Sequence, residues 1–400
     1  MHYLDQAANS WPKPATVYQA LDQGFARQSS DPSRRREHSS REETEATLLA
    51  AQRELAPLLS VPDPTGLSFT RSCEEALAKA FALFPWQPGD GIVISALEHR
   101  AMLSPVFHLA RTRGVQVYIV PYTEAEPFSL DECETLLKTH PEIRLIATTH
   151  ASNAVGCMLP LAEIGRLAKR YGKPFLVDAA QTAGVRPIHV QRDGIDLLAF
   201  PGHKFLNGPR GTGALYVSEA IRDACSPSSM QSCHTALLPE TDARFIPRLQ
   251  AFTAGVRWVR TQGLSRIQSH TTELLAALQD ELEAIPEVTV YGLSDLSRHT
   301  ALLSFNVLNH HPETLTQKLF NHFGIQVRAG LHHAHLAHEA MGTLHRGGTL
   351  RASLGYQTRT EDIEALIQAL KHILVSSSSG SPSAMRLLRQ DPANSPSGKL

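Results

Sequence analysis

The chain has 400 residues, of which 42% are hydrophobic and 19% charged, and its formal net charge is −1. This composition is typical of a globular protein with one large and one smaller domain, and the near-zero charge gives no reason to expect a nucleic-acid partner or a membrane surface. The start of the chain lacks the features of a signal peptide, no apolar run is long enough to span a bilayer, and the five cysteines are scattered. We therefore expect a cytoplasmic protein.

In the first part of the chain, short apolar runs are interspersed with helical patterns, as in a doubly wound α/β sheet. The predicted strands cover residues 67–70, 91–95, 175–177 and 197–200. A helix that begins near Pro160 ends at Gly172, immediately before the strand at 175–177. These elements predict a large domain over residues 16–255, preceded by an N-terminal segment, 1–15, that packs near the active site.

The last part of the chain predicts a smaller α+β domain over residues 256–375. Its predicted helices cover 263–285, 312–323 and 361–374, and its predicted strands cover 288–291, 301–307, 325–328 and 350–354. From residue 376 to residue 400 the composition turns to Ser, Pro and Gly, which is typical of a disordered tail.

Two of the predicted strands end in residues that can do chemistry. The run 175–177 ends in Asp178, and the run 197–200 leads into Pro201-Gly202-His203-Lys204. The carboxyl ends of such strands are where open α/β sheets bind ligands. An acid and an amine facing one crevice suit pyridoxal phosphate (PLP), because the amine forms a Schiff base and the acid keeps the pyridine nitrogen protonated. The alternative is a buried Asp–Lys pair in an unrelated α/β protein.

The motifs Asp178-Ala179-Ala180-Gln181 and Gly202-His203-Lys204 resemble those of the class V aminotransferases, and most closely their cysteine desulfurase branch. The resemblance extends from about Tyr3 to about Leu374. It implies the fold type I of PLP-dependent transferases, with a mostly parallel doubly wound sheet in the large domain. It also implies that Lys204 is the Schiff-base lysine, that Asp178 contacts the ring nitrogen, that Gln181 contacts the ring oxygen, and that His203 contacts the phosphate.

Further motifs extend this resemblance to the substrate side. His150-Ala151-Ser152-Asn153 implies that Asn153 donates to the ring oxygen and borders the substrate, and Glu98-His99 implies that His99 stacks on the ring and takes part in proton transfer. Arg351 matches the arginine that binds the substrate α-carboxylate, a role suited to a bidentate guanidinium. A lone histidine at a strand end is otherwise more often structural.

The start of the helix after strand 67–70 is the expected phosphate cradle, formed by Ser72, Cys73 and the backbone N–H groups that follow. Glu74 stands where the family has threonine, and its carboxylate would repel a phosphate dianion. Ser72 and Glu75 also form a capping box, which requires no ligand. Pro201 likewise replaces a hydroxyl residue, and the segment 218–257 lacks the Gly-Thr that reaches the partner subunit in the family's homodimer.

The loop from Arg328 to His338 resembles the desulfurase loop that carries the nucleophilic cysteine, but here that position is His333. Imidazole cannot carry a persulfide, so a desulfurase would need another thiol, and Cys225 and Cys233 are the candidates. The four histidines of this loop have no spacing typical of a metal site. A general acid–base role for His333 is the favoured hypothesis.

The sequence therefore predicts a PLP enzyme that acts on an α-amino acid, and cysteine desulfurase is the function that the resemblance implies. A homodimer and a sulfur-acceptor protein are its implied partners. One alternative is a PLP-dependent lyase or aminotransferase on the same fold, without persulfide chemistry. Another is a non-catalytic relative that binds a partner. The presence of seven site residues together argues against this last alternative: Lys204, Asp178, Gln181, His203, His99, Asn153 and Arg351.

Overall fold

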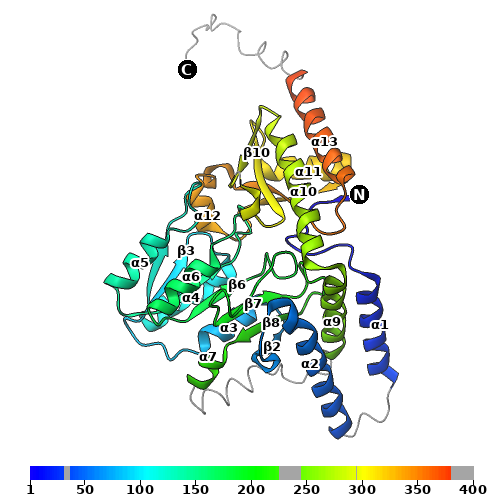
Figure 1. The fold of residues 1–400 in the computed structure, drawn as a ribbon. Coiled ribbons are helices and arrows are strands. Elements are labelled where there is room, and N and C mark those ends of the chain that lie inside the picture. The colour runs from blue at the N-terminus through cyan, green and yellow to red at the C-terminus, as the bar shows by residue number, and fades with distance from the viewer. Residues whose placement is uncertain (31–36, 225–244, 294, 380–400) are drawn as a thin grey trace, which may run out of the picture.

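The computed structural model describes residues 1–30, 37–224, 245–293 and 295–379. Its largest sheet has seven strands (Figure 1). In order across the sheet they are β2 (Leu67–Thr70), β8 (Gly213–Val217), β7 (Leu197–Pro201), β6 (Phe175–Asp178), β5 (Ile143–Thr149), β3 (Gly91–Ser95) and β4 (Gln116–Val120). The pairs from β7 to β4 are parallel, and β8 is antiparallel to both of its neighbours. The predicted doubly wound, mostly parallel sheet is confirmed.

The two faces of this sheet are covered by different helices, and the side chains of its central strands alternate between them. Leu176 and Leu197 belong to the apolar cluster that contains α3 (Cys73–Ala82) and α4 (Arg100–Arg113). Their neighbours Val177 and Leu198 belong to the cluster that contains α5 (Leu130–Thr139) and α6 (Leu161–Arg170). Burial on both faces explains why these strands are continuous apolar runs.

A second group of helices packs at one edge of the molecule, where α1 (Ala15–Ser30) and α2 (Glu37–Leu59) both contact α9 (Phe245–Gln262) (Figure 1). The domain boundary expected at residue 256 lies inside α9. The short helix α7 (Glu219–Ala224) follows β8.

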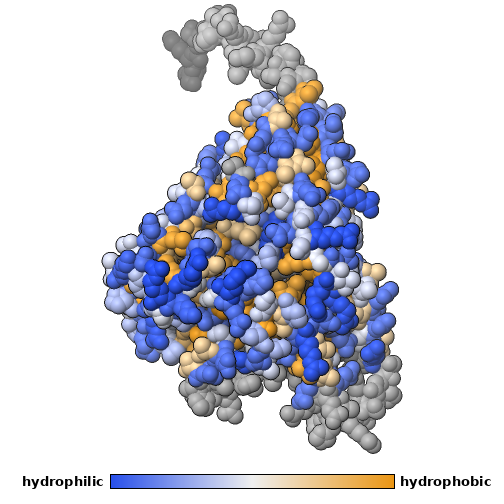
Figure 2. Space-filling model, in the orientation of Figure 1, coloured by the Kyte–Doolittle hydropathy of each residue, from blue (hydrophilic) through white to orange (hydrophobic). Residues whose placement is uncertain are grey.

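Among the described residues, no helix is long and apolar enough to cross a membrane. The face shown in Figure 2 is mainly hydrophilic, with hydrophobic residues in scattered patches.

The smaller domain is built on a four-stranded antiparallel sheet. In order its strands are β12 (Arg328–Gly330), β13 (Thr349–Ser353), β10 (Leu302–Val307) and β9 (Val288–Tyr291). Its helices are α10 (Leu264–Glu283), α11 (Pro312–Phe323), α12 (His335–Ala340) and α13 (Thr360–Ser379). The helix predicted at 312–323 is confirmed at both ends, and α13 continues past residue 374 into the range expected for the tail.

The single strand predicted at 325–328 was wrong, because the chain changes sheets at Val327. β11 (Ile325–Gln326) pairs with β1 (His2–Tyr3), whereas β12 pairs with β13. Asp5 bridges to Ser353 of β13 directly after β1. These pairings bring the N-terminal segment and the loop after β12 to the edge of the active-site cavity.

Candidate active site

A cavity of about 450 Å³ lies at the carboxyl ends of β6 and β7, where both domains contribute side chains. It brings together every site residue predicted from the sequence, and these line it: Ser72, Cys73, His99, Asn153, Asp178, Gln181, His203, Lys204, His333 and Arg351. It also contains residues that the prediction did not include, among them Ala7, Arg71, Arg210 and Arg328.

The centre of the cavity is formed by Asp178 and Lys204. Asp178 is almost wholly buried, and its Oδ1 accepts hydrogen bonds from the Ala180 N–H (2.8 Å) and from the Cys73 thiol (3.5 Å). Burial raises the pKa of Asp178, and burial also lowers the pKa of Lys204 although the nearby Asp178 opposes this. A lowered pKa leaves a larger share of the lysine as the neutral amine, which is the form that acts as a nucleophile.

Five polar atoms of residues that line the cavity are buried and have no hydrogen-bond partner among the described residues. They are Oε1 of Gln181, Oδ1 of Asn153, Nδ1 of His203, Nδ1 of His332 and Nε of Arg351. Buried polar groups are nearly always paired, so five unpaired atoms around one cavity indicate a polar ligand. The Asn153 amide nitrogen donates one hydrogen to His332 O (2.6 Å), and that of Gln181 donates one to Ala7 O (3.3 Å). Each amide keeps a second hydrogen, which can be donated to the ring oxygen of a substituted pyridine.

The start of α3 lies beside the cavity and is closed by its own residues. Ser72 is the N-cap, and its hydroxyl accepts from the Glu75 N–H (3.2 Å), while the Glu75 carboxylate accepts from the Arg71 N–H (2.8 Å). Of the capping box considered from the sequence, the Ser72 half is present, whereas Glu75 binds the Arg71 N–H in place of the Ser72 N–H. Glu74 is exposed and lines the cavity, so its carboxylate faces the space expected for the phosphate.

His99 begins α4 and is held as a neutral imidazole. Its Nδ1 accepts from the Ala101 N–H (3.0 Å), and burial, with Lys204 and His333 nearby, lowers its pKa to about 3. Its other ring nitrogen, Nε2, therefore carries the hydrogen and can donate into the cavity. The structural capping role and the site role thus coexist in one residue.

His333 lies beside His99 at the cavity mouth, in the loop between β12 and α12. It is exposed, and its ring packs edge-on to that of His99, with centroids 5.6 Å apart. The loop takes a left-handed turn, with φ angles of 49° at His332 and 59° at His333, and the His333 carbonyl accepts from the Arg100 N–H (2.7 Å). This turn presents the His333 side chain at the entrance to the Lys204 cavity.

Arg351 is fully buried and is oriented by the N-terminal segment. Its Nη1 donates to Asn153 O (2.9 Å) and its Nη2 to Asp5 Oδ1 (3.1 Å), whereas its Nε is buried without a described partner. Asp5 also receives a bidentate contact from Arg328, from Nε to Oδ1 (3.2 Å) and from Nη2 to Oδ2 (2.9 Å). One carboxylate between two guanidinium groups leaves a net positive charge, which suits binding of a substrate carboxylate. The sequence prediction did not include Asp5 or Arg328 as site residues, although Arg328 begins the loop that carries His333.

The cysteines of the described residues are not placed as nucleophiles. Cys73, Cys133 and Cys157 are all buried, and their pKa values are raised, chiefly by burial. Cys73 is the one of these that lines the cavity, but its thiol faces Asp178. The thiols proposed from the sequence, Cys225 and Cys233, lie outside the described residues. Within the described part of the chain, no group of three or more His, Cys, Asp or Glu could hold a metal ion.

Comparison with known proteins gives the family of this fold and cavity. The family profile described as Aminotransferase class-V matches residues 2–366, which is most of the chain. The chain belongs to the class V aminotransferases. A relative named probable cysteine desulfurase, from Methanothermobacter thermautotrophicus, is 30% identical over 384 residues, which are 93% of this chain and 94% of the relative.

Solved structures of similar proteins agree with the class V aminotransferase assignment. The apo structure of a cysteine desulfurase from Thermococcus onnurineus NA1 has a TM-score of 0.79 and 28% identity, and the match covers 94% of each chain. A mutant of the protein named C-DES, with glycine covalently linked to its PLP cofactor, has a TM-score of 0.74 and 21% identity, covering 92% of this chain and 96% of that one. This class V aminotransferase is a PLP-dependent enzyme of fold type I, as the sequence predicted, and not a non-catalytic relative.

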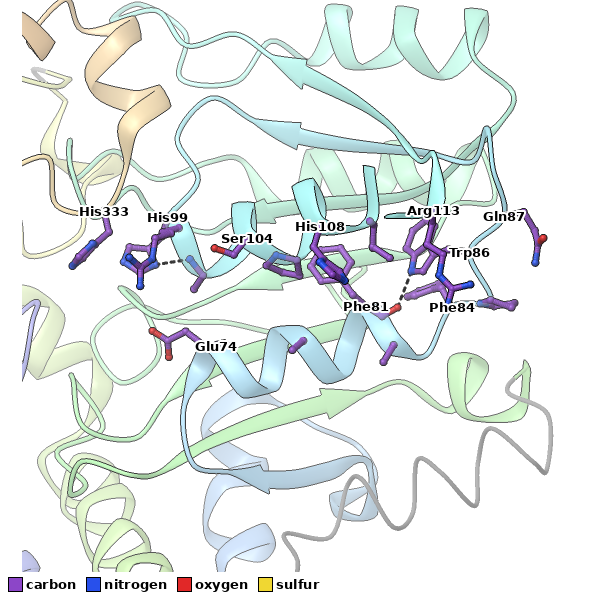
Figure 3. Close-up of a pocket in the computed structure, with 17 residues that line it drawn as sticks. Glu74, Phe81, Phe84, Trp86, Gln87, His99, Ser104, His108, Arg113 and His333 are labelled. Carbon is purple, nitrogen blue, oxygen red and sulfur yellow. Dashed lines mark hydrogen bonds between the residues drawn. The ribbon is translucent and has the colours of Figure 1, made fainter. Parts of the chain in front are cut away.

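A larger cavity of about 890 Å³ adjoins the first, between α3 and α4 (Figure 3). It contains neither Lys204 nor Asp178, both of which line the smaller cavity.

Proposed function

We propose that this PLP-dependent enzyme cleaves the carbon–sulfur bond of a cysteine-type amino acid by β-elimination, without a persulfide on the protein. The observation that carries this proposal is the position of His333. An imidazole stands at the mouth of the Lys204 cavity, at the loop position where the desulfurase resemblance requires a thiol. Imidazole cannot accept sulfur, but it can give a proton to a departing thiolate.

The side chains around the cavity have separate tasks in this proposal. When bound, PLP supplies the electron sink that permits loss of the Cα proton and of the β-substituent. The Arg351 guanidinium binds the substrate carboxylate, the neutral Lys204 amine takes the proton from Cα, and His333 protonates the sulfur as the Cβ–S bond breaks. Water then hydrolyses the released enamine to pyruvate and ammonium, which balances the reaction without an oxidant or a reductant.

The second candidate is cysteine desulfurase itself, which forms alanine and transfers sulfur to a protein thiol. It is favoured by the names of the relatives. It requires Cys225, Cys233 or another thiol to replace the missing loop cysteine, and it alone calls for a sulfur-acceptor protein. A homodimer and a cytoplasmic location are proposed for either candidate, on the family resemblance and on the scattered cysteines.

Product analysis of the full chain with PLP and L-cysteine separates the two candidates. Elimination predicts pyruvate, ammonium and sulfide in equal amounts, with no alanine. Prior alkylation of exposed thiols with iodoacetamide should leave the rate unchanged, because no protein thiol takes part. Alanine as the main product, lost after alkylation, would refute elimination and favour the desulfurase.

A further inference from the structure

The cavity between α3 and α4 is a groove that begins at the active site and leads away from it. Figure 3 shows Glu74, His99 and His333 together at one end, while Trp86 and Gln87 lie at the other. Its walls are the facing sides of α3 and α4. A groove of about 890 Å³ is roughly twice the size of the cavity around Lys204.

The lining of the groove combines apolar side chains with polar and charged ones, and the charged ones include Glu74, Arg100 and Arg113. Phe81 and Trp86 are buried at 3% and 8% exposure and form its floor, together with Phe84, whose ring lies 5.5 Å from that of Trp86. The one polar atom of the indole is satisfied, because Trp86 Nε1 donates to Phe81 O (2.8 Å). The middle of the groove is bordered by Ala78, Ala82, Pro105 and Leu109. Such a surface gains free energy when it takes an apolar group from water.

The groove and the Lys204 cavity are continuous, since Glu74, His99, Ala101 and His333 line both. The junction is therefore flanked by the two imidazoles, which pack edge to face. A group that leaves the β-carbon of a substrate and takes its proton from His333 would lie at the entrance of the groove. Free cysteine has no S-substituent that could fill the groove.

We propose that the groove binds the S-substituent of an S-conjugated cysteine, an apolar group of about benzyl size or larger. This inference rests on the proposed β-elimination and names its substrate class. A nucleophilic thiol can take sulfur only from a substrate with an unsubstituted thiol, whereas a proton from imidazole serves any departing thiolate. The Cα proton passes to Lys204, the electron pair of the Cβ–S bond stays on sulfur, His333 protonates that sulfur, and water converts the remaining enamine to pyruvate and ammonium.

The test compares S-benzyl-L-cysteine with L-cysteine in the full chain with PLP. We expect benzyl mercaptan and pyruvate in equal amounts, with kcat/KM for the conjugate about tenfold or more above that for cysteine. Ala78→Trp fills the middle of the groove and should remove this preference while leaving cysteine turnover within about twofold. Ala46→Trp, at an exposed alanine of α2, is the matched control and should change neither substrate.

Three results would overturn the inference, and they are distinguishable. Pyruvate from cysteine but not from the conjugate would reject the substrate class and retain the proposed function. Pyruvate from neither substrate would reject the proposed function itself. Conversion of an oligomer to a monomer by Ala78→Trp in light scattering, with equal loss of both activities, would mean that a second copy of the chain covers the groove.

Discussion

The rings of His99 and His333 pack edge to face at the mouth of the Lys204 cavity, with centroids 5.6 Å apart and planes at 78°. The Ala101 N–H occupies Nδ1 of His99, and the pKa of about 3 keeps this ring neutral, so it serves as a fixed donor. The ring of His333 makes no hydrogen bond to a described residue. Of the two, His333 is the imidazole that we propose as the acid in the elimination.

Lys204→Ala should abolish turnover, because the substitution removes both the amine that bonds to PLP and the base that takes the Cα proton. The measurement is the visible spectrum with borohydride reduction and mass mapping, which should trap the cofactor on Lys204 in the unmodified chain and nowhere in the variant. Lys371→Ala removes an exposed lysine paired with Glu281 and is the control. A coloured, active Lys204→Ala protein would show that another lysine binds the cofactor.

Arg351→Lys should raise KM for the amino acid by about 10- to 100-fold while PLP binding is retained, because one ammonium cannot reproduce a planar guanidinium fork. Asp5 and the Asn153 carbonyl hold the guanidinium in place, and lysine cannot satisfy both and still bind a carboxylate. Steady-state kinetics and PLP titration measure the two effects separately. An unchanged KM would show that the carboxylate binds elsewhere.

Glu74→Thr should tighten PLP binding by about tenfold, since it replaces a repelling carboxylate with a hydroxyl donor at the start of α3. Pyridoxal, which lacks the phosphate, should bind equally well to both proteins. Fluorescence titration with the two ligands gives the comparison. Equal gains for both ligands would mean that Glu74 acts on the ring and not on the phosphate.

Glu98 is wholly buried behind the site, where burial raises its pKa to about 8 although the Ser95 hydroxyl and the Thr149 N–H both donate to it. A carboxyl whose pKa is raised in the folded state stabilises the protein fully below its unfolded pKa of about 4.5, and this stabilisation is lost as the pH rises through 8. Between about pH 5 and 9, the free energy of unfolding should therefore fall further in the unmodified chain than in Glu98→Gln. The difference between the two falls should exceed about 1 kcal/mol. Urea denaturation at several pH values measures this, and parallel curves would contradict it.

Much of the fold could be predicted because the apolar runs of β6 and β7 are short, buried on both faces and followed by polar residues. The same signal led to Asp178 and Lys204, which do line one cavity. The prediction of a single strand at 325–328 failed for a physical reason. The local sequence pattern cannot indicate that Val327 separates the two residues paired with β1 from the three residues paired with β13.

The tertiary contacts of the site were beyond sequence reasoning. Asp5 lies 346 positions from Arg351, and only the pairing of the N-terminal segment with the smaller domain brings the two together. The groove between α3 and α4 has no sequence motif, because its lining residues read as ordinary faces of two amphipathic helices.

The most direct test of the account is the product partition of the unmodified chain beside that of His333→Cys, each with L-cysteine. We predict that the unmodified chain forms pyruvate and sulfide by β-elimination. The variant should form alanine and carry sulfur on the introduced thiol, which mass spectrometry detects. The loop already presents position 333 to the cavity, so the substitution changes the chemistry without moving the backbone. Alanine from the unmodified chain, with a persulfide on Cys225 or Cys233, would contradict the account and identify the chain as a desulfurase with a relocated thiol.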